Sequence, residues 1–425
     1  MGSDNLKPDR RFMTYSVAAV VSVAAVLFAA TAPQGHVGDA RTTISMPPTA
    51  RIVTVGNTPV SAVVDERTGL VFVLNLNRPP DPDPTDAPGG ARPVPGTVSV
   101  LDPIQGRVLC TMRVGTNPAS IAVDARTARV FVADRGPTTR NDVHFPSSIV
   151  SVLAAGCPSG RPNGSLIPAL RTVSVGYRPL QVAVDERAGH AFVIDGESLR
   201  VLDGRTGAVL HTTEVLSSTP PLDAMAVDER DGRVYVAGYE YSGIHVFAAA
   251  DGRIVRSIRV GAHLGQIAVD TRLGHVFVVW QSSEPSEADV LDAASGRVIG
   301  TAMVGAMPRA IVADERSGRV FVLAGFTEFV HGDSNISELD ARSGALLRTI
   351  TVGSHTMGMA VDTVTGRLYV ASAQGVSVLD GATGAVLRTL PLAMQPSSIV
   401  VDERTGQVIV INATGNSVSI FNALR

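Results

Sequence analysis

The stretch VVDERTGLVFV at residues 63–73 decides the fold, because versions of it recur along the whole chain. Close copies are AVDERDGRVYV at 226–236 and VVDERTGQVIV at 400–410. Eight copies are present, each centred on one aspartate: Asp65, Asp124, Asp185, Asp228, Asp270, Asp314, Asp362 and Asp402. Successive aspartates are 59, 61, 43, 42, 44, 48 and 40 residues apart. The spacing indicates a repeat of about 40–44 residues with insertions in the early units.

A second phrase lies between these copies, as in SVLDGATG at 377–384, and a short apolar–polar alternation follows it. The alternation and the many Val, Ile and Phe residues indicate strands rather than helices. Asp-x-x-Thr-Gly suits a tight turn, because Asp bonds the backbone two residues on and Gly accepts a positive φ. Each unit therefore predicts four strands, A to D. Four strands in a repeat of this length are typical of an all-β fold, the β-propeller.

The two ends of the repeat region fix the number of blades. The last A-B-C triplet ends at Phe421 without a D strand, whereas residues 51–55 form a D-type strand without a triplet before it. Pairing 51–55 with 417–421 would complete one blade and close the ring, which removes exposed strand edges. We therefore predict eight four-stranded blades in one domain at 49–425. Seven blades plus a stray unit is the alternative.

The motifs V-G-x-x-P, A-V-D-x-x-T-G-x-V-[FY]-V and S-V-L-D-x-x-T-G, seen at 114–132 and 377–384, resemble the YVTN family of bacterial β-propeller repeats. The resemblance covers residues 51–425. It implies that strand A lines the channel and that the D–A and B–C connections share one face. It implies no particular activity, since repeats rather than a catalytic signature define that family.

The N-terminal segment has the pattern of a membrane-targeting sequence. Lys7, Arg10 and Arg11 precede the uncharged stretch 12–32, and the next charged residue is Asp39. About 20 apolar residues can span a bilayer, and cations before the span favour an internal N-terminus. We expect a cytoplasmic tail at 1–11, one transmembrane helix at 12–32, a linker at 33–48 and a propeller outside the cytoplasm. The alternative is a cleaved signal and a secreted protein.

Composition excludes several classes of protein. The net charge of −3 argues against nucleic acid as a partner. Two cysteines cannot form a Cys-rich metal site, and no cofactor or metal site is predicted. Cys110 and Cys157 fall in neighbouring blades, so a disulfide between them is a candidate in an oxidising compartment.

Candidate contact residues gather on the face with the B–C and D–A connections. The long B–C insertions, 75–96, 134–147 and 324–335, lie there. Several aromatic residues fall outside the repeated core position, and polar residues are expected around the channel mouth. The candidate ligand or partner contacts are Arg178, Asp223, Tyr239, Tyr241, His263, Trp280, Arg309, Phe326, Phe329 and His355.

These observations predict a membrane-anchored or exported monomer that acts as a binding or scaffold module on the cell surface, for an unknown protein or cell-envelope ligand. No catalytic residues are assigned. One alternative is a lactonase-like propeller hydrolase or lyase with His263, His355, Arg178 and Asp223 at the channel mouth, which rests on fold analogy alone. A purely structural module is another.

Overall fold

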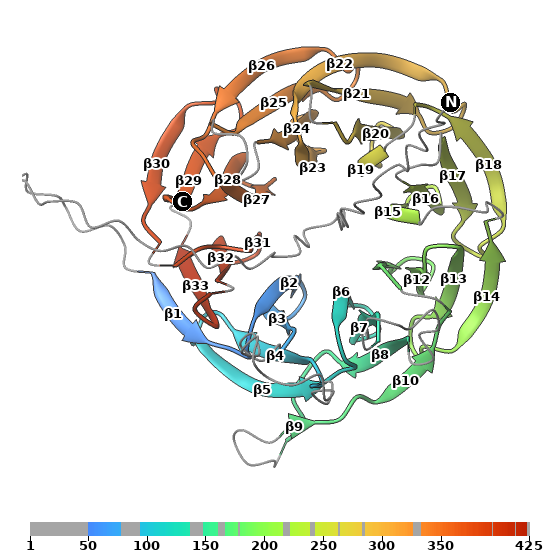
Figure 1. The fold of residues 1–425 in the computed structure, drawn as a ribbon, viewed down its shortest axis with the longest axis vertical. Coiled ribbons are helices and arrows are strands. Elements are labelled where there is room, and N and C mark those ends of the chain that lie inside the picture. The colour runs from blue at the N-terminus through green and yellow to red at the C-terminus, as the bar shows by residue number, and fades with distance from the viewer. Residues whose placement is uncertain are drawn as a thin grey trace, which may run out of the picture.

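The computed structural model of the chain is a ring of β-sheets around a central channel (Figure 1). It describes residues 50–77, 94–136, 148–159, 166–176, 179–215, 222–238, 243–261, 264–282, 285–325, 333–392, 394–412 and 414–422. Within these ranges the regular structure is all β, in eight sheets. The predicted tail, membrane segment and linker lie outside them. In the described part of the chain no helix has the length and hydrophobicity needed to cross a bilayer.

Seven blades take their four strands from one stretch of chain each. The first three are β2 (Pro59–Asp65), β3 (Leu70–Asn75), β4 (Thr97–Asp102) and β5 (Arg107–Arg113); β6 (Pro118–Asp124), β7 (Arg129–Asp134), β8 (Ile149–Ala154) and β10 (Arg171–Ser174); and β11 (Gln181–Asp185), β12 (His190–Ile194), β13 (Ser198–Asp203) and β14 (Val209–Glu214). The next two are β15 (Leu222–Asp228), β16 (Arg233–Gly238), β17 (Gly243–Ala248) and β18 (Ile254–Arg259); and β19 (Leu264–Asp270), β20 (His275–Trp280), β21 (Pro285–Asp292) and β22 (Val298–Ala306). The sixth and seventh are β23 (Pro308–Asp314), β24 (Arg319–Ala324), β25 (Asn335–Asp340) and β26 (Leu346–Thr351); and β27 (Thr356–Asp362), β28 (Arg367–Ser372), β29 (Gly375–Asp380) and β30 (Val386–Leu390).

The eighth blade joins the two ends of the repeat region. It contains β31 (Ser398–Asp402), β32 (Gln407–Asn412), β33 (Ser417–Asn422) and, as its outer strand, β1 (Arg51–Thr54). Arg51 pairs with Ile420 and Thr54 with Ser417 in an antiparallel ladder. The predicted count of eight and the predicted closure are confirmed, and the seven-blade alternative is wrong.

The core consists of eight hydrophobic clusters, one between each pair of neighbouring blades. One large side chain from the second strand of each of seven blades is fully buried in these clusters. These side chains are Phe72, Phe131, Phe192, Tyr235, Phe277, Phe321 and Tyr369. Val and Ala fill most of the remaining space, which explains how a chain with 4% aromatic residues packs a core of this size.

The first and second blades are also joined covalently. Cys110 on β5 and Cys157 after β8 form a disulfide with a Cα–Cα distance of 5.9 Å. The same insertion supplies β9 (Leu166–Ile167), which pairs in parallel with Thr111 and Met112 and makes the first blade five-stranded. The structure thus pairs the two candidate cysteines, whereas the extra strand was not foreseen.

Candidate functional site

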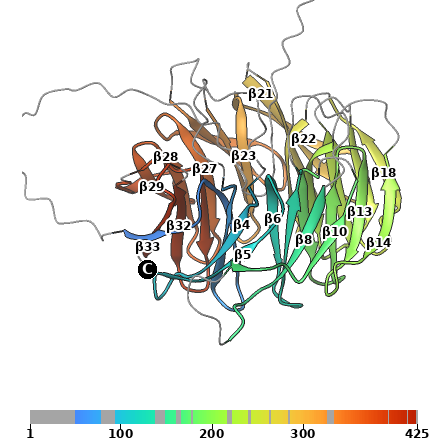
Figure 2. The same ribbon diagram turned by 60° about the horizontal axis from the view of Figure 1, so that its bottom comes forward.

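The ring has two faces with different connections. We call the face with the B–C and D–A connections the upper face and the face with the A–B and C–D turns the lower face. In Figure 2 the lower face is at the bottom of the ring. The candidate contact residues were predicted on the upper face.

A repeated corner builds the upper face. The glycine of each V-G-x-x-P motif lies against the residue that ends the second strand of its blade, so Gly56 contacts Asn75 and Gly115 contacts Asp134. A Cβ at Gly115 would lie 2.7 Å from Asp134 Cγ, closer than side chains tolerate. This close approach therefore requires glycine at the corner. The residue at the end of the second strand, which we call the opposing residue, differs between blades.

Most of the opposing residues are polar and buried. Asn75 donates through Nδ2 to the Ser99 hydroxyl at 3.1 Å. In the next blade, Asp134 accepts from the Gly115 amide at 3.1 Å and from the Ser151 hydroxyl at 3.0 Å. Burial raises the pKa of Asp134 from 3.8 to about 7, and these two hydrogen bonds offset only part of that rise. Asp134 is therefore a buried acid near its titration point at neutral pH.

Trp280 occupies the same position in the fifth blade. Its indole ring lies directly against Gly261, and its Nε1 donates to Asp289 at 3.2 Å. Asp289 is buried, and Thr301 donates to its other carboxylate oxygen at 2.5 Å. The side chain of Trp280 is half-buried. The predicted contact residue is thus held in the corner and remains partly exposed.

The residues around the channel mouth have strained backbones. Four residues that stand seven positions before a repeat aspartate, Thr58, Asn117, Met307 and His355, have φ of 51°, 70°, 53° and 55°. A left-handed conformation costs about 1 kcal/mol for a non-glycine residue, and such residues gather at functional sites. The imidazole of His355 is exposed at this position.

The other predicted contacts are only partly described. Arg309 lies on β23 at the same face and is half-buried. Asp223 lies on β15, but its side chain is outside the described residues. Arg178, Tyr239, Tyr241, His263, Phe326 and Phe329 also lie outside the described residues. Trp280, Arg309 and His355 therefore share a face but belong to three different blades.

The lower face is held by a polar belt that the sequence analysis missed. The repeat aspartates cap their own turns: Asp402 Oδ1 accepts from the amides of Arg404 and Thr405 at 3.0 and 3.2 Å. The arginine two positions after the aspartate then donates to a turn carbonyl of the next blade, as Arg272 does to Glu315 at 2.7 Å. The arginines with this role are Arg67, Arg126, Arg187, Arg230, Arg272, Arg316 and Arg404. Val364 replaces the arginine at the remaining junction.

Glutamates reinforce this belt in the opposite direction. Glu315 accepts from the Thr271 amide at 2.7 Å, and Glu403 accepts from the Thr363 amide at 2.9 Å. Glu186 and Glu229 make the same contact with the blade before them. The recurring Asp-Glu-Arg sequence could have predicted these contacts between blades, but we had interpreted it only as part of a turn.

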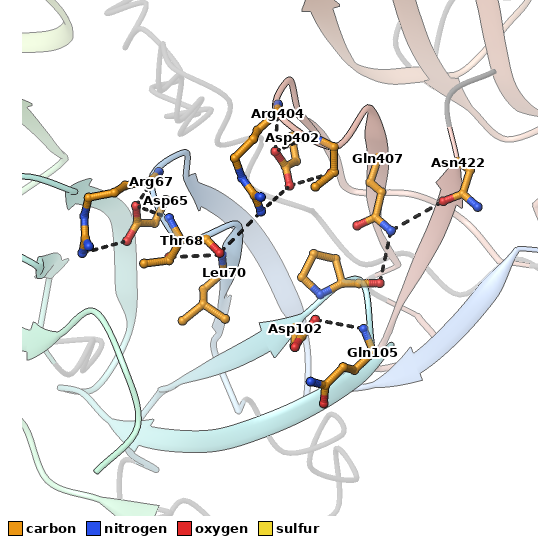
Figure 3. Close-up of polar contacts among 12 residues, drawn as sticks. Asp65, Arg67, Thr68, Leu70, Asp102, Gln105, Asp402, Arg404, Gln407 and Asn422 are labelled. Atoms are coloured by element: carbon orange, nitrogen blue, oxygen red, sulfur yellow. Dashed lines mark hydrogen bonds and ion pairs between the residues drawn. The ribbon is translucent and has the colours of Figure 1, made fainter. Parts of the chain in front are cut away.

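The closing junction between the eighth and first blades also brings charged groups together, and Figure 3 shows its polar contacts. Arg404 lies 3.8 Å from Asp402 and donates across the junction to the Thr68 carbonyl at 3.4 Å. Burial and the charges of Asp402 and Glu403 raise the pKa of Glu66 to about 7. Despite these carboxylates, no group of three or more His, Cys, Asp or Glu in the described residues is arranged to hold a metal ion.

The fold and its closure define the chain as an eight-bladed β-propeller. A similar solved structure is hydrazine synthase of Kuenenia stuttgartiensis, with a TM-score of 0.54 and 16% identity over 73% of this chain and 97% of that chain. At that identity the likeness shows the fold alone. No protein-family model and no curated protein matches the sequence. Membership of the YVTN family is therefore not shown and remains a resemblance of motifs.

Proposed function

We propose that the chain is an exported, membrane-tethered propeller that binds a protein or cell-envelope ligand through its upper face. The observation that carries the proposal is the Cys110–Cys157 disulfide, which contains both cysteines of the chain. Disulfides persist outside the reducing cytoplasm. The disulfide therefore agrees with the export signal expected at the N-terminus.

The upper face is the better candidate for binding because it is where the blades differ. The described ends of the three long B–C connections, at Asn77, Gly136 and Gly325, all lie there. Trp280 presents a half-buried aromatic ring on the same face, and His355 presents an exposed imidazole. Aromatic and polar groups on a rigid scaffold are typical of binding surfaces.

Two experiments test the proposal. Alkylation of intact cells before non-reducing lysis should find Cys110 and Cys157 unmodified and linked, and free thiols would contradict export. In the second experiment, residues 50–425 are used to capture a ligand from the cell envelope. A variant with His355→Gly and Tyr241→Ala should no longer capture the ligand that the unsubstituted protein binds. Glycine at 355 suits the left-handed backbone, so the change removes the imidazole without strain. Unchanged capture by this variant would mean that the upper face is not the binding surface.

A further inference from the structure

The outer strands of the ring begin with a repeated irregularity. In the pair β29–β30, Val378 pairs with Arg388 and Leu379 with Val386, so Leu387 has no partner of its own. The same β-bulge occurs at the start of the outer strand in the pairs β4–β5, β13–β14, β17–β18, β21–β22 and β25–β26. A β-bulge sets two residues opposite one and re-aims their side chains.

The residues at these bulges are aliphatic and exposed in five consecutive blades. We call them the rim doublets: Val209, Leu210, Ile254, Val255, Val298, Ile299, Leu346, Leu347, Val386 and Leu387. Their exposed fractions are 37–51%. A bulge alone protects a strand edge from pairing, so edge protection does not require aliphatic side chains. Apolar groups repeated around a rim instead indicate a contact surface.

The rim doublets follow one another around the outside of the ring. Each C–D turn overlaps the preceding blade: a Cβ at Gly252 would lie 2.6 Å from Val201, and one at Gly296 would lie 2.9 Å from Ile258. The doublets come directly after these turns, at the edge of the lower face. Figure 1 shows the strands that carry them, β14, β18, β22, β26 and β30, side by side around the outside of the ring.

The equivalent position of the first blade is less exposed. Val108 and Leu109 are the equivalent doublet, and both are half-buried. Val108 packs against the hydrophobic cluster between the eighth and first blades. The partly apolar insertion that carries Cys157 and Ile167 packs farther along the same strand, at Cys110, Thr111 and Met112. The outer strand therefore accepts apolar cover.

The described part of the chain begins at the same edge of the ring. Ile52 pairs with Ser419 as Thr389 pairs with Ser377, so Ala50 is the counterpart of Leu387. Ala50, at which the described part of the chain begins, thus lies at the doublet position of the eighth blade. The 17 residues from 33 to 49 reach at most about 56–61 Å when fully extended. A bilayer that holds residues 12–32 can therefore lie no farther than this distance from the lower edge of the eighth blade.

We propose that the rim doublets dock the lower face of the propeller on the lipid bilayer, which leaves the upper face directed away from the membrane. This inference rests on the proposed export and tethering. Arg256 is exposed and Arg388 is half-exposed, and each directly follows a doublet. Guanidinium groups bind phosphates well, so vesicles with anionic headgroups should bind more strongly.

Vesicle flotation of residues 50–425 tests the docking without the tether. All eight blades, including the closing strand, lie within this segment. The probe is vesicles of equimolar phosphatidylglycerol and phosphatidylethanolamine, compared with phosphatidylcholine vesicles. Replacing Leu210, Val255, Ile299, Leu347 and Leu387 by Gln should reduce the bound fraction at least about tenfold. The control Val94→Gln with Met303→Gln changes equally exposed residues away from that edge and should bind like the wild type.

Trp280 reports the orientation, because it is the only tryptophan of the chain and lies at the upper face. Brominated lipids should leave its fluorescence unquenched in bound protein. Absence of flotation, equal flotation of the five-residue variant, or quenching of Trp280 would overturn the docking. A dimer that the same five substitutions dissociate, without flotation, would assign the rim doublets to a second copy and would also overturn it.

Failure of the tether is a separate result. Carbonate extraction of membranes that contain the full chain tests the tether. Release of a mature protein without residues 1–32 would contradict the tether. The flotation assay would still test the docking surface, because it uses residues 50–425 alone.

Discussion

The lower and upper faces of this ring are built from the same repeats but use them differently. At the lower face every A–B turn has the same aspartate. In nearly every turn an arginine two positions later donates a hydrogen bond to a backbone carbonyl of the next blade. At the upper face the corner glycine is present in six of the eight blades, and the residue ten positions after the repeat aspartate changes from blade to blade: Asn75, Asp134, Asp195, Gly238, Trp280, Ala324, Ser372 and Asn412. Repetition within the chain therefore marks the face that holds the ring, and variation marks the face available for a ligand.

The largest expected effect concerns the junction between the first two blades. There the belt lacks a glutamate, since Ala125 stands where most turns carry one, and the disulfide spans the same pair of blades. Replacing Cys110 and Cys157 by Ala should reduce the free energy of unfolding by about 4 kcal/mol, from the 47-residue separation. Urea denaturation measures the change. A reducing agent should lower the wild-type midpoint and leave that of the variant unchanged; equal midpoints would contradict the cross-linking role.

A smaller loss is expected when one turn of the belt is broken. Asp402 is buried and accepts from two amides and from the Thr405 hydroxyl at 2.6 Å. Asp402→Ala should cost about 2–3 kcal/mol, because three donors lose their acceptor. Asp402→Asn keeps one oxygen acceptor and should cost clearly less. If both variants unfold at the same urea concentration, the turn bonds do not stabilise the closure.

At the upper face a substitution should stabilise the protein. Asp134 has a folded-state pKa of about 7 against an ordinary 3.8, so its stabilising form is the protonated one. Stability should therefore fall as pH rises from about 4 through about 7. Asp134→Asn imitates Asn75 and should gain on the order of 1–2 kcal/mol at pH 8.

The pH profile provides the control for this gain. At pH 4 the wild type is already largely protonated at Asp134, so Asp134→Asn should add little stability there. Thermal unfolding at both pH values measures the difference. A loss of stability at pH 8 would mean that the carboxylate itself is needed in this corner.

The smallest effect tests whether the belt can be completed. Val364 is the one A–B turn position where the arginine is missing, and it is exposed. Val364→Arg should raise the free energy of unfolding by about 0.5 kcal/mol or less, as exposed polar contacts do. Val364→Lys introduces a positive charge without the planar guanidinium donor and should raise the free energy of unfolding by less. A clear loss with Arg in thermal unfolding would contradict the role given to this position.

Sequence reasoning predicted the lower face better than the upper one. The eight units, the closing strand at 51–55 and the Asp-Gly turns follow from local patterns that repeat with a fixed period. The disulfide followed from blade order, since Cys110 and Cys157 fall in adjacent units. The extra strand β9 was missed because two residues carry no strand pattern of their own, and their pairing depends on the insertion being clamped beside β5.

The candidate site was harder to predict because its residues do not repeat. Trp280 was recognised as an unusual aromatic, but nothing in the sequence showed that it fills the place of Asn75 and Asp134 against a corner glycine. That relation needs the distance between the ends of two strands. The left-handed backbone at His355 has the same origin: the corner, rather than the residue type, imposes the positive φ.

The most direct test of the account compares two exposed positions of one blade in the native membrane. A photo-crosslinking residue is placed at position 355 on the upper face or at position 364 on the lower face. Position 355 should capture the ligand or partner, and position 364 should capture lipid and lack that adduct. The reverse distribution, or the same partner at both positions, would contradict the assignment of the two faces.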